Sequence, residues 1–533
     1  MTNQIIDNQQ RSASTPTDAG VPAPTNAELP YQPTASFQIL SKSFQPDIID
    51  GVFALATFAL GFFYIYWVMV NWQGWGVALF TLMYVGTILV YFRAKKTSLK
   101  RESWFWLTVV LLTGLSFALW NNNGLYGWPI LLLFASAVYW VVSANGAQIK
   151  EKTSDWLVFD GINAFMKIPI LNFMCTFQAL KVLNPRKSKG LGKQSLSVML
   201  GLFMALLVIA IALPLLMNAD SGGFAKLTKF IGDLLAKTNL DIVLIFRLIL
   251  SILTGAYIFG LTKGCVYKQG TDSLKANDLQ KNIQGLRILP EISVYIMLGL
   301  VCALYLLFMG SQLPYFFSAF ARVLPTGYQA YAEYARSGFF ELCQIATLNL
   351  VVLLGANLMI KGAYEESRVL KIYNIVLATL TLFLICTALS KMGMYIGVYG
   401  LSMRRLLPCV FMVFMIVVYS GVIARQKWSF SVVRLSLFTG VLLICLLCLS
   451  NSDRLVADYN ASRYLNGSLV DFDVLTLYQA GPAGVNAAQK IYAGAKDPVL
   501  KEEVGQFLAE QQRYAQEAQG KMHINWETSR ILQ

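Results

Sequence analysis

The chain is poor in the residues that carry most hydrolytic and metal chemistry. Its 533 residues include one histidine, His523, and neither an HExxH nor a GxSxG motif occurs. Zinc-dependent and nucleophilic hydrolysis therefore have little support. Charged residues make up only 14% of the chain, whereas soluble domains contain about 25%. This shortage of charge argues against a soluble protein.

The eight cysteines do not form a disulfide framework. Most of them lie within apolar runs, and residues 450–533 contain none. Cys445 and Cys448 have CxxC spacing, but they stand among leucines in an apolar run. We interpret them as small buried hydrophobic residues rather than a redox or metal pair. The sequence therefore predicts no metal site and no cofactor.

Long apolar runs dominate what is present. Hydrophobic residues make up 56% of the chain and the mean hydropathy is +0.54. The runs are continuous rather than alternating, and each is long enough to cross about 30 Å of hydrocarbon as a helix. We predict an all-α polytopic membrane bundle of about eleven transmembrane helices with a small C-terminal extracytoplasmic helical domain. The predicted spans are 49–70, 74–92, 104–120, 125–143, 195–217, 240–262, 288–310, 339–360, 371–390, 406–424 and 432–449.

The lysines and arginines predict how the chain is threaded. Most of them fall on one set of alternate connections, above all 93–103, 144–194 and 263–287. Because positive residues are retained in the cytoplasm, we expect a cytoplasmic N-terminus and an extracytoplasmic C-terminus. Retention of this kind also accounts for the net charge of +14. Membrane lipids are therefore the expected partners, with no nucleic acid; a dedicated anionic partner is the alternative.

The distribution of residue types divides the chain into five parts. The N-terminal part is polar and rich in Pro, Thr, Gln and Ala, and it shows no cleavable signal peptide. The basic part, residues 144–194, is amphipathic, and we expect its helix to break at Pro169. The C-terminal part has expected helix breaks at Pro482 and Pro498. We predict a disordered cytoplasmic tail (1–48), N-terminal membrane hairpins (49–143), a basic cytoplasmic amphipathic segment (144–194), a main membrane domain (195–449) and an extracytoplasmic helical tail (450–533).

Three patches of glutamate, arginine and tyrosine fall on the predicted extracytoplasmic side. Glu341 stands at the mouth of an apolar run, and a carboxylate at membrane depth is unfavourable unless it is paired or hydrated. Such a residue is a candidate for a functional site. The candidate face comprises Tyr331, Glu333, Tyr334, Arg336, Gly338, Phe339 and Glu341 in the first patch, Tyr399, Gly400, Arg404 and Arg405 in the second, and Asn460, Arg463 and Tyr464 in the third.

Two interpretations of this face stay open. In the first, ion pairs such as Glu341 with Arg404 or Arg463 clamp the C-terminal tail onto the membrane helices. In the second, the arginines form a pocket for an anion, such as a phosphate-bearing lipid or envelope precursor. A separate arginine, Arg247, lies within the sixth span, and we expect its side chain to reach toward the membrane surface.

The three patches resemble a bacterial multi-pass inner-membrane family of unknown function, of the DUF4153/4173 type. Its blocks YAEYAR-x-GFFEL, Y-I-x-x-YGL-T-x-x-R and N-x-x-RY are similar to Tyr331–Leu342, Tyr395–Arg404 (with Ser402 in place of Thr) and Asn460–Tyr464. The similarity covers about 195–485. A further family feature, an Asp-Ala-x-Pro-like turn, is replaced here by Ala480-Gly481-Pro482. The resemblance implies a bacterial inner-membrane protein and no particular activity.

Several function classes remain to be weighed. The first predicted outer loop, 71–75, has no acidic residue, unlike that of polytopic glycosyltransferases that use lipid-linked sugars. We identify no catalytic residue, although Glu333 and Glu341 could act as acid and base if their pKa values differed enough. Our main hypothesis is a structural or regulatory cell-envelope protein that binds an envelope protein through its tail. The alternative is a lipid- or envelope-precursor-handling transporter or membrane enzyme, and whether the protein is an enzyme is left open.

Overall fold

The computed structural model describes residues 44–69, 72–183, 242–269, 284–321, 338–361 and 367–533, together with five single positions between 201 and 216. Regular secondary structure within these residues is helical, and the only β feature there is one isolated bridge between Leu289 and Ile360. The predicted all-α class is therefore confirmed for the described part of the chain.

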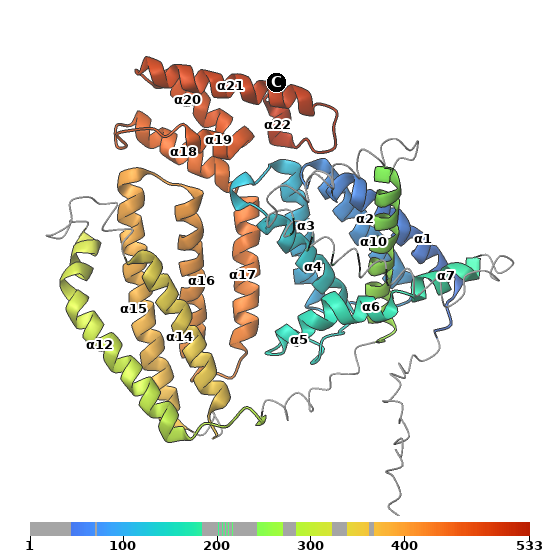
Figure 1. Ribbon diagram of the computed structural model, residues 1–533, viewed down its shortest axis with the longest axis horizontal. Coiled ribbons are helices and arrows are strands. Elements are labelled where there is room, and N and C mark those ends of the chain that lie inside the picture. Colours follow the sequence, from blue (N-terminus) through green and yellow to red (C-terminus); the bar gives the residue numbers. More distant parts are fainter. Residues whose placement is uncertain are drawn as a thin grey trace, which may run out of the picture. The chain divides into compact units, whose positions relative to one another are not determined.

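The first group of membrane helices comes from the N-terminal half. Asp47 and Asp50 begin its first helix with reciprocal hydrogen bonds between each side chain and the other residue's N–H. That helix continues as a π-helix, η1. The group lies together in Figure 1 and consists of α1 (Ile48–Phe63), η1 (Tyr64–Met69), α2 (Trp75–Ala94), α3 (Ser103–Leu119), α4 (Trp128–Ala144) and α10 (Ile242–Val266).

Glycines allow α1 and α10 to cross with their backbones in contact. A Cβ atom at Gly61 would overlap the Ser251 carbonyl, and one at Gly255 would lie 2.6 Å from the Thr57 carbonyl. No side chain larger than hydrogen fits either position. Small residues at crossings of membrane helices permit this close approach.

The amphipathic segment that follows α4 bends at a different place from the one predicted. Its pieces are α5 (Leu157–Ile162), η3 (Asn163–Lys167), α6 (Ile168–Asn172) and α7 (Cys175–Leu183), and a 45° bend separates α6 from α7. The expected break at Pro169 is therefore wrong. Pro169 stands at the beginning of α6, directly after the π-helical turn η3, where its missing N–H is tolerated.

The second group of membrane helices comes from the C-terminal half. Its apolar core includes Leu298, Phe339, Leu377 and Met412. Inside this core the side chain of Asn349 accepts from the Tyr305 hydroxyl and donates to Thr381. The group consists of α12 (Glu291–Ala321), α14 (Phe339–Met359), α15 (Arg368–Tyr399), α16 (Met403–Arg425) and α17 (Val432–Leu449).

Eight helices among the described residues are long and apolar enough to cross a membrane, or nine if the bent segment counts as one. The helices α3 and α4 are apolar but shorter, with 17 residues each. The predicted span at 195–217 lies outside the described residues apart from single positions. A multi-pass membrane protein is thus confirmed, while the number eleven stays a prediction.

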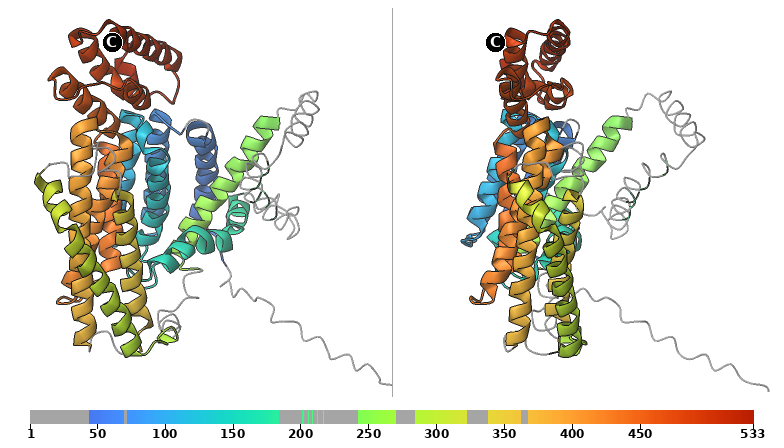
Figure 2. Two further views of the ribbon diagram at one scale, coloured as in Figure 1. Left: turned by 60° about the vertical axis from the view of Figure 1, so that its left-hand side comes forward. Right: turned by 90° about the vertical axis from the view of Figure 1, so that its left-hand side faces the viewer.

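The C-terminal tail, residues 450–533, is helical and has an apolar core of its own. Ala461, Leu477, Ile491 and Phe507 are among the buried residues of that core. Both views of Figure 2 place these helices at one end of α15, α16 and α17. The tail consists of α18 (Ser452–Leu465), α19 (Leu475–Ala480), η5 (Gly481–Gly484), α20 (Val485–Gly494), α21 (Pro498–Ala518) and α22 (Trp526–Arg530), so helices change at Pro482 and Pro498 as predicted.

Candidate functional site

The first predicted patch is only partly described. Tyr331, Glu333, Tyr334 and Arg336 lie outside the described residues. The other three residues open α14. Gly338 precedes the helix with φ +82°, a conformation that favours glycine. Phe339 is fully buried, and Glu341 is exposed in the first turn.

The second and third patches meet in the structure. The Asn460 side chain accepts from the Leu401 N–H at 2.7 Å and donates to the Leu401 carbonyl at 2.7 Å. Gly400, with φ +78°, makes this approach possible, because a Cβ atom there would lie 2.7 Å from Asn460 Oδ1. Asn460 thus joins α18 of the tail to the turn between α15 and α16.

Two arginines of the candidate face cap the end of α15. Arg463 Nη1 donates to the Ile396 carbonyl at 3.1 Å. Arg405 Nη1 donates to the carbonyls of Tyr399 and Gly400, and its guanidinium lies 4.3 Å from the Tyr395 ring. Positive groups at a helix C-terminus satisfy its last carbonyls and complement its dipole. The arginine forks are therefore directed at the protein's own backbone.

The remaining residues of these patches take different positions. The Arg404 side chain is exposed, and Tyr399 is 44% exposed. The ring of Tyr464 packs at 5.9 Å from Phe472 within the tail. Among the described residues, no ion pair joins Glu341 to Arg404 or Arg463. The tail is therefore held by other contacts than the predicted ion pairs.

Lys391 is a charged neighbour of the first patch that the sequence analysis did not single out. Its ammonium lies 3.4 Å from the place that a Cβ atom at Gly338 would take, and the residue is only 8% exposed. The predicted span ended at residue 390, directly before this lysine. The structure continues α15 to Tyr399, so Lys391 is inside the helix.

A second contact of the tail is made by a buried carboxylate. Both Asp453 oxygens accept from the Gly124 N–H, at 3.1 and 3.0 Å. Gly124 belongs to the turn between α3 and α4, where Asn122 and Tyr126 have positive φ. Burial raises the pKa of Asp453 to about 6, while hydrogen bonds from Gly124 and Asn123 act in the opposite direction.

The last residues of the tail make a third set of contacts. Asn451 donates to Glu527 at 2.6 Å, and burial raises the pKa of Glu527 to about 7, with the Asn451 hydrogen bond opposing. Asn525 donates to the Asn121 side chain. The N–H groups of Trp75 and Gly76 donate to carbonyls of the tail, those of Ile524 and Met522.

We call these contacts the tail junction. It comprises Asn451, Asp453, Asn460, Arg463, Asn525 and Glu527 with the turns 74–76, 121–124 and 400–401. Beneath it lies a small apolar cluster that includes Leu125, Met403, Cys448 and Val456. The three turns had been predicted to share one side of the membrane. All three contact the tail, so they do lie at one end of the helices.

A cluster of charged residues at the start of α1 was missed by the sequence analysis. Asp50 is fully buried, lies 2.8 Å from the Lys95 ammonium and accepts from the hydroxyls of Tyr91 and Tyr267. Lys95 also pairs with Asp47 at 2.8 Å. We call these five residues the Asp50 network. It joins α1 to the ends of α2 and α10.

The charges of this network support one another. Burial alone would raise the pKa of Asp47 and lower that of Lys95. The hydrogen bonds between them outweigh burial, so the pKa of Asp47 is lowered and that of Lys95 is raised. Both groups are therefore ionised near neutral pH.

A second buried lysine lies near this network. Lys263 is fully buried in the last turn of α10 and donates to Asn172 at 3.1 Å, to Cys175 Sγ at 3.4 Å and to Gln269. The sixth span was predicted to end at residue 262, which placed this lysine in a loop. An ionisable residue at each edge of an apolar run was the signal that could have identified Asp50 and Lys263.

Other single residues of interest are accounted for by packing. The Arg247 guanidinium lies 5.5 Å from the Tyr66 ring. Cys445 and Cys448 are buried and free. Within the described residues, no group of three or more His, Cys, Asp or Glu is placed to hold a metal ion.

Comparison with known proteins identifies a family. The family model described as Domain of unknown function (DUF4153) matches residues 107–490. The chain belongs to this family. The DUF4153 match begins within α3 and ends within α20, so it starts well before residue 195, where the resemblance was expected to begin. It includes the second group of membrane helices, most of α3 together with α4 and α10 from the first group, and most of the tail junction, whereas α1, η1 and α2 precede it. No curated protein and no solved structure matches the chain.

Proposed function

We propose that the protein is a structural or regulatory component of the bacterial cell envelope. It resides in the inner membrane, with the N-terminus in the cytoplasm and the tail on the extracytoplasmic side. The observation that carries this proposal is the tail junction. It ties the tail to turns 74–76 and 121–124 of the first helix group and to turn 400–401 of the second. The tail thus bridges both groups and is held in a fixed orientation.

A tail held in this way is suited to present a binding surface. Several apolar side chains of the tail lie outside its apolar core and are exposed, including Val470 at 89%, Leu475 at 64% and Val499 at 65%. Contiguous exposed apolar patches mark sites that bind another protein, and we infer that these side chains belong to such a patch. These residues favour an envelope protein as the partner.

The proposed orientation can be tested by chemical labelling. Val470→Cys places a thiol on the tail, and Glu151→Cys places one on an exposed side chain at the end of the bundle that holds the Asp50 network. In intact spheroplasts a membrane-impermeant maleimide should label the first variant and not the second. The unsubstituted protein measures labelling of the native cysteines. Labelling of Glu151→Cys alone would contradict the orientation.

The proposed role can be tested by crosslinking in cells. A photo-crosslinking residue at Val470 or Leu475 should capture a discrete envelope protein. The same residue at Leu354, which is 56% exposed on α14 within the membrane, is the matched control. Equal adducts from all three positions, or adducts with lipid alone, would contradict a partner-binding tail.

The alternative, a protein that handles a lipid or an envelope precursor, is favoured by a different observation. The first helix group encloses an apolar cavity. This cavity does not involve the tail.

A further inference from the structure

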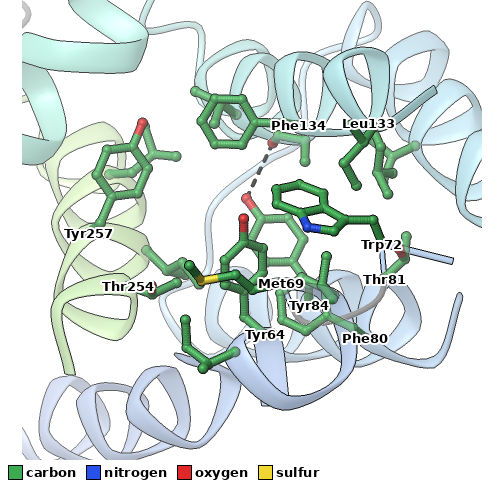
Figure 3. A pocket seen from close by; sticks show the side chains of 18 of the residues that line it. Tyr64, Met69, Trp72, Phe80, Thr81, Tyr84, Leu133, Phe134, Thr254 and Tyr257 are labelled. Carbon is green, nitrogen blue, oxygen red and sulfur yellow. Dashed lines mark hydrogen bonds between the residues drawn. The ribbon is translucent and has the colours of Figure 1, made fainter. Parts of the chain in front are cut away.

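The first group of membrane helices surrounds a cavity of about 560 Å³. Its lining comes from η1, Trp72 between η1 and α2, and the helices α2, α3, α4 and α10. Figure 3 shows Tyr64, Trp72, Tyr84, Phe134 and Tyr257 around this space. Its volume falls within the range of about 300–1,000 Å³ that is usual for small-molecule sites.

The cavity opens toward the side of the bundle, in the half next to the tail junction. Met69 at the end of η1 is 39% exposed, and Trp72, between η1 and α2, is 44% exposed. Leu131 and Phe134 in the first turns of α4 are 54% and 48% exposed. All four side chains line the cavity. Because η1 and α4 belong to apolar membrane helices, the solvent at this opening is lipid rather than water.

The local backbone explains why a space remains here. α1 touches the backbone of α10 at Gly61, and three residues later the chain changes from α-helix to the π-helix η1. The wider turn redirects Tyr64, Ile65 and Val68 to the cavity wall. Single π-helical turns within membrane or soluble helices are frequent at functional sites.

The wall is almost entirely apolar, and most of its polar groups are already bonded. The hydroxyls of Tyr84 and Tyr257 donate to the carbonyls of Ala137 and Phe165 on neighbouring segments. Among the described residues, the hydroxyls of Tyr64 and Thr254 are the lining hydroxyls with no hydrogen-bond partner. The side chains of the lining include no charged residue.

This chemistry defines the class of ligand. Transfer of a charged or sugar group into such a wall is unfavourable, because nothing there would replace its hydration. A hydrocarbon chain meets no such penalty. Two free hydroxyls can donate to a weak acceptor at one end of the chain, such as an ester carbonyl.

We propose that the cavity holds one acyl chain of a glycerophospholipid as a bound ligand. The chain enters between η1 and α4, the headgroup stays outside in the leaflet next to the tail, and Tyr64 and Thr254 donate to the ester carbonyl. This site goes beyond the proposed function and does not depend on it, since the tail contributes none of its residues.

The site can be tested with the full chain in nanodiscs that contain a phosphatidylethanolamine bearing a diazirine on one acyl chain. After photolysis, peptide mass spectrometry should locate adducts on cavity residues such as Met69 and Phe134 in preference to α14. An excess of unlabelled phosphatidylethanolamine should compete for these adducts, and a polyprenyl phosphate should not. Competition by the polyprenyl phosphate alone would overturn the assignment to an acyl chain.

Substitutions separate a bound lipid from lipid that merely surrounds the protein. Thr254→Trp should fill the cavity and lower the adduct yield by about tenfold, the factor that 1.4 kcal/mol of affinity represents. Leu354→Trp, on the exposed face of α14, is the control and should not change it. Tyr64→Phe should lower the yield by a smaller factor. An even spread of adducts over all membrane helices of the unsubstituted protein would overturn the proposal, even if Thr254→Trp fails to fold.

Discussion

The Asp50 network and the tail junction both bury polar groups between helices, but they satisfy them differently. In the Asp50 network, charged side chains pair with each other and with tyrosine hydroxyls. In the tail junction, amide, carboxylate and guanidinium side chains bind the backbone of turns. The first arrangement joins helix ends, whereas the second fixes the position of a separate segment.

This difference determines what happens when one partner is lost. Removal of a partner from a buried ion pair leaves a charge without compensation. Removal of a side chain from the tail junction leaves a neutral backbone group without its partner, which is a smaller loss than a buried charge without its partner. The two regions should therefore respond to substitution with different magnitudes.

The largest effect is expected in the Asp50 network. Lys95→Met should lower the free energy of unfolding by about 3–5 kcal/mol, because Asp50 would be left buried without its cation. Thermal unfolding of the purified protein in detergent measures the change.

Lys100→Met is the matched control for this substitution. Lys100 pairs with Glu151 at 3.2 Å, but both side chains are about half exposed or more, at 48% and 65%. Exposed pairs contribute about 0–1 kcal/mol. If the two lysine variants lose the same free energy of unfolding, the buried ion pair stabilises the protein no more than the exposed one.

The second effect is a pH dependence of the tail junction. The pKa of Asp453 is raised from 3.8 to about 6 and that of Glu527 from 4.5 to about 7. The folded state thus holds these protons more tightly than the unfolded chain. The resulting stability is complete below pH about 4 and is lost as the pH rises through 6 and 7. Each group accounts for up to about 3 kcal/mol, since one pKa unit is about 1.4 kcal/mol.

Unfolding midpoints measured from pH 5 to pH 8 test this prediction. The unsubstituted protein should lose stability across the window, and Asp453→Asn and Glu527→Gln should each flatten the slope. Asp471→Asn, at an exposed position of the tail, should leave it unchanged. A slope of the opposite sign would mean that the two carboxylates are ionised and stabilising in the folded protein.

A third, smaller effect is expected at Asn460. Asn460→Ala removes both hydrogen bonds to Leu401 and should lower stability by about 1–3 kcal/mol. Gly400→Ala should act on the same contact through its positive φ and the close Asn460 side chain. Limited proteolysis should then cut between the last membrane helix and the tail faster than in the unsubstituted protein. If the cleavage rate is unchanged, Asn460 does not hold the tail.

The same comparison shows what the sequence could predict. Local patterns in the sequence were enough to predict three features, because membrane insertion and helix breaking depend on neighbouring residues. These features are the apolar helices, the change of helix at Pro482 and Pro498 in the tail, and the position of the three turns on one side. The meeting of Gly400 with Asn460 was indicated only as a shared side. The hydrogen bonds between Asn460 and Leu401 depend on the conformation of a backbone turn, which the periodicity of the sequence does not predict.

The charged residues inside helices were not predictable in this way. Asp50, Lys263 and Lys391 stand at the edges of apolar runs, and the predicted spans 240–262 and 371–390 ended directly before the two lysines. A lone charge in hydrocarbon is unfavourable. The structure supplies partners from distant segments for Asp50 and Lys263, so the helices continue. Partners far apart in sequence cannot be read from a single run.

The smallest effects on stability are expected for substitutions of Arg404 and Arg405, the two neighbouring arginines of the candidate face, and the two should differ. Arg405 donates to two carbonyls at the end of α15 and stacks on Tyr395, so Arg405→Ala should lower stability by about 1–2 kcal/mol. Arg404 is exposed, and Arg404→Ala should change stability by less than about 0.5 kcal/mol. Arg404→Glu should be equally mild, since no ion pair with Glu341 is present among the described residues to be reversed. A large loss for Arg404→Glu that Glu341→Arg restores would instead reinstate the ion-pair clamp between α14 and the turn before α16.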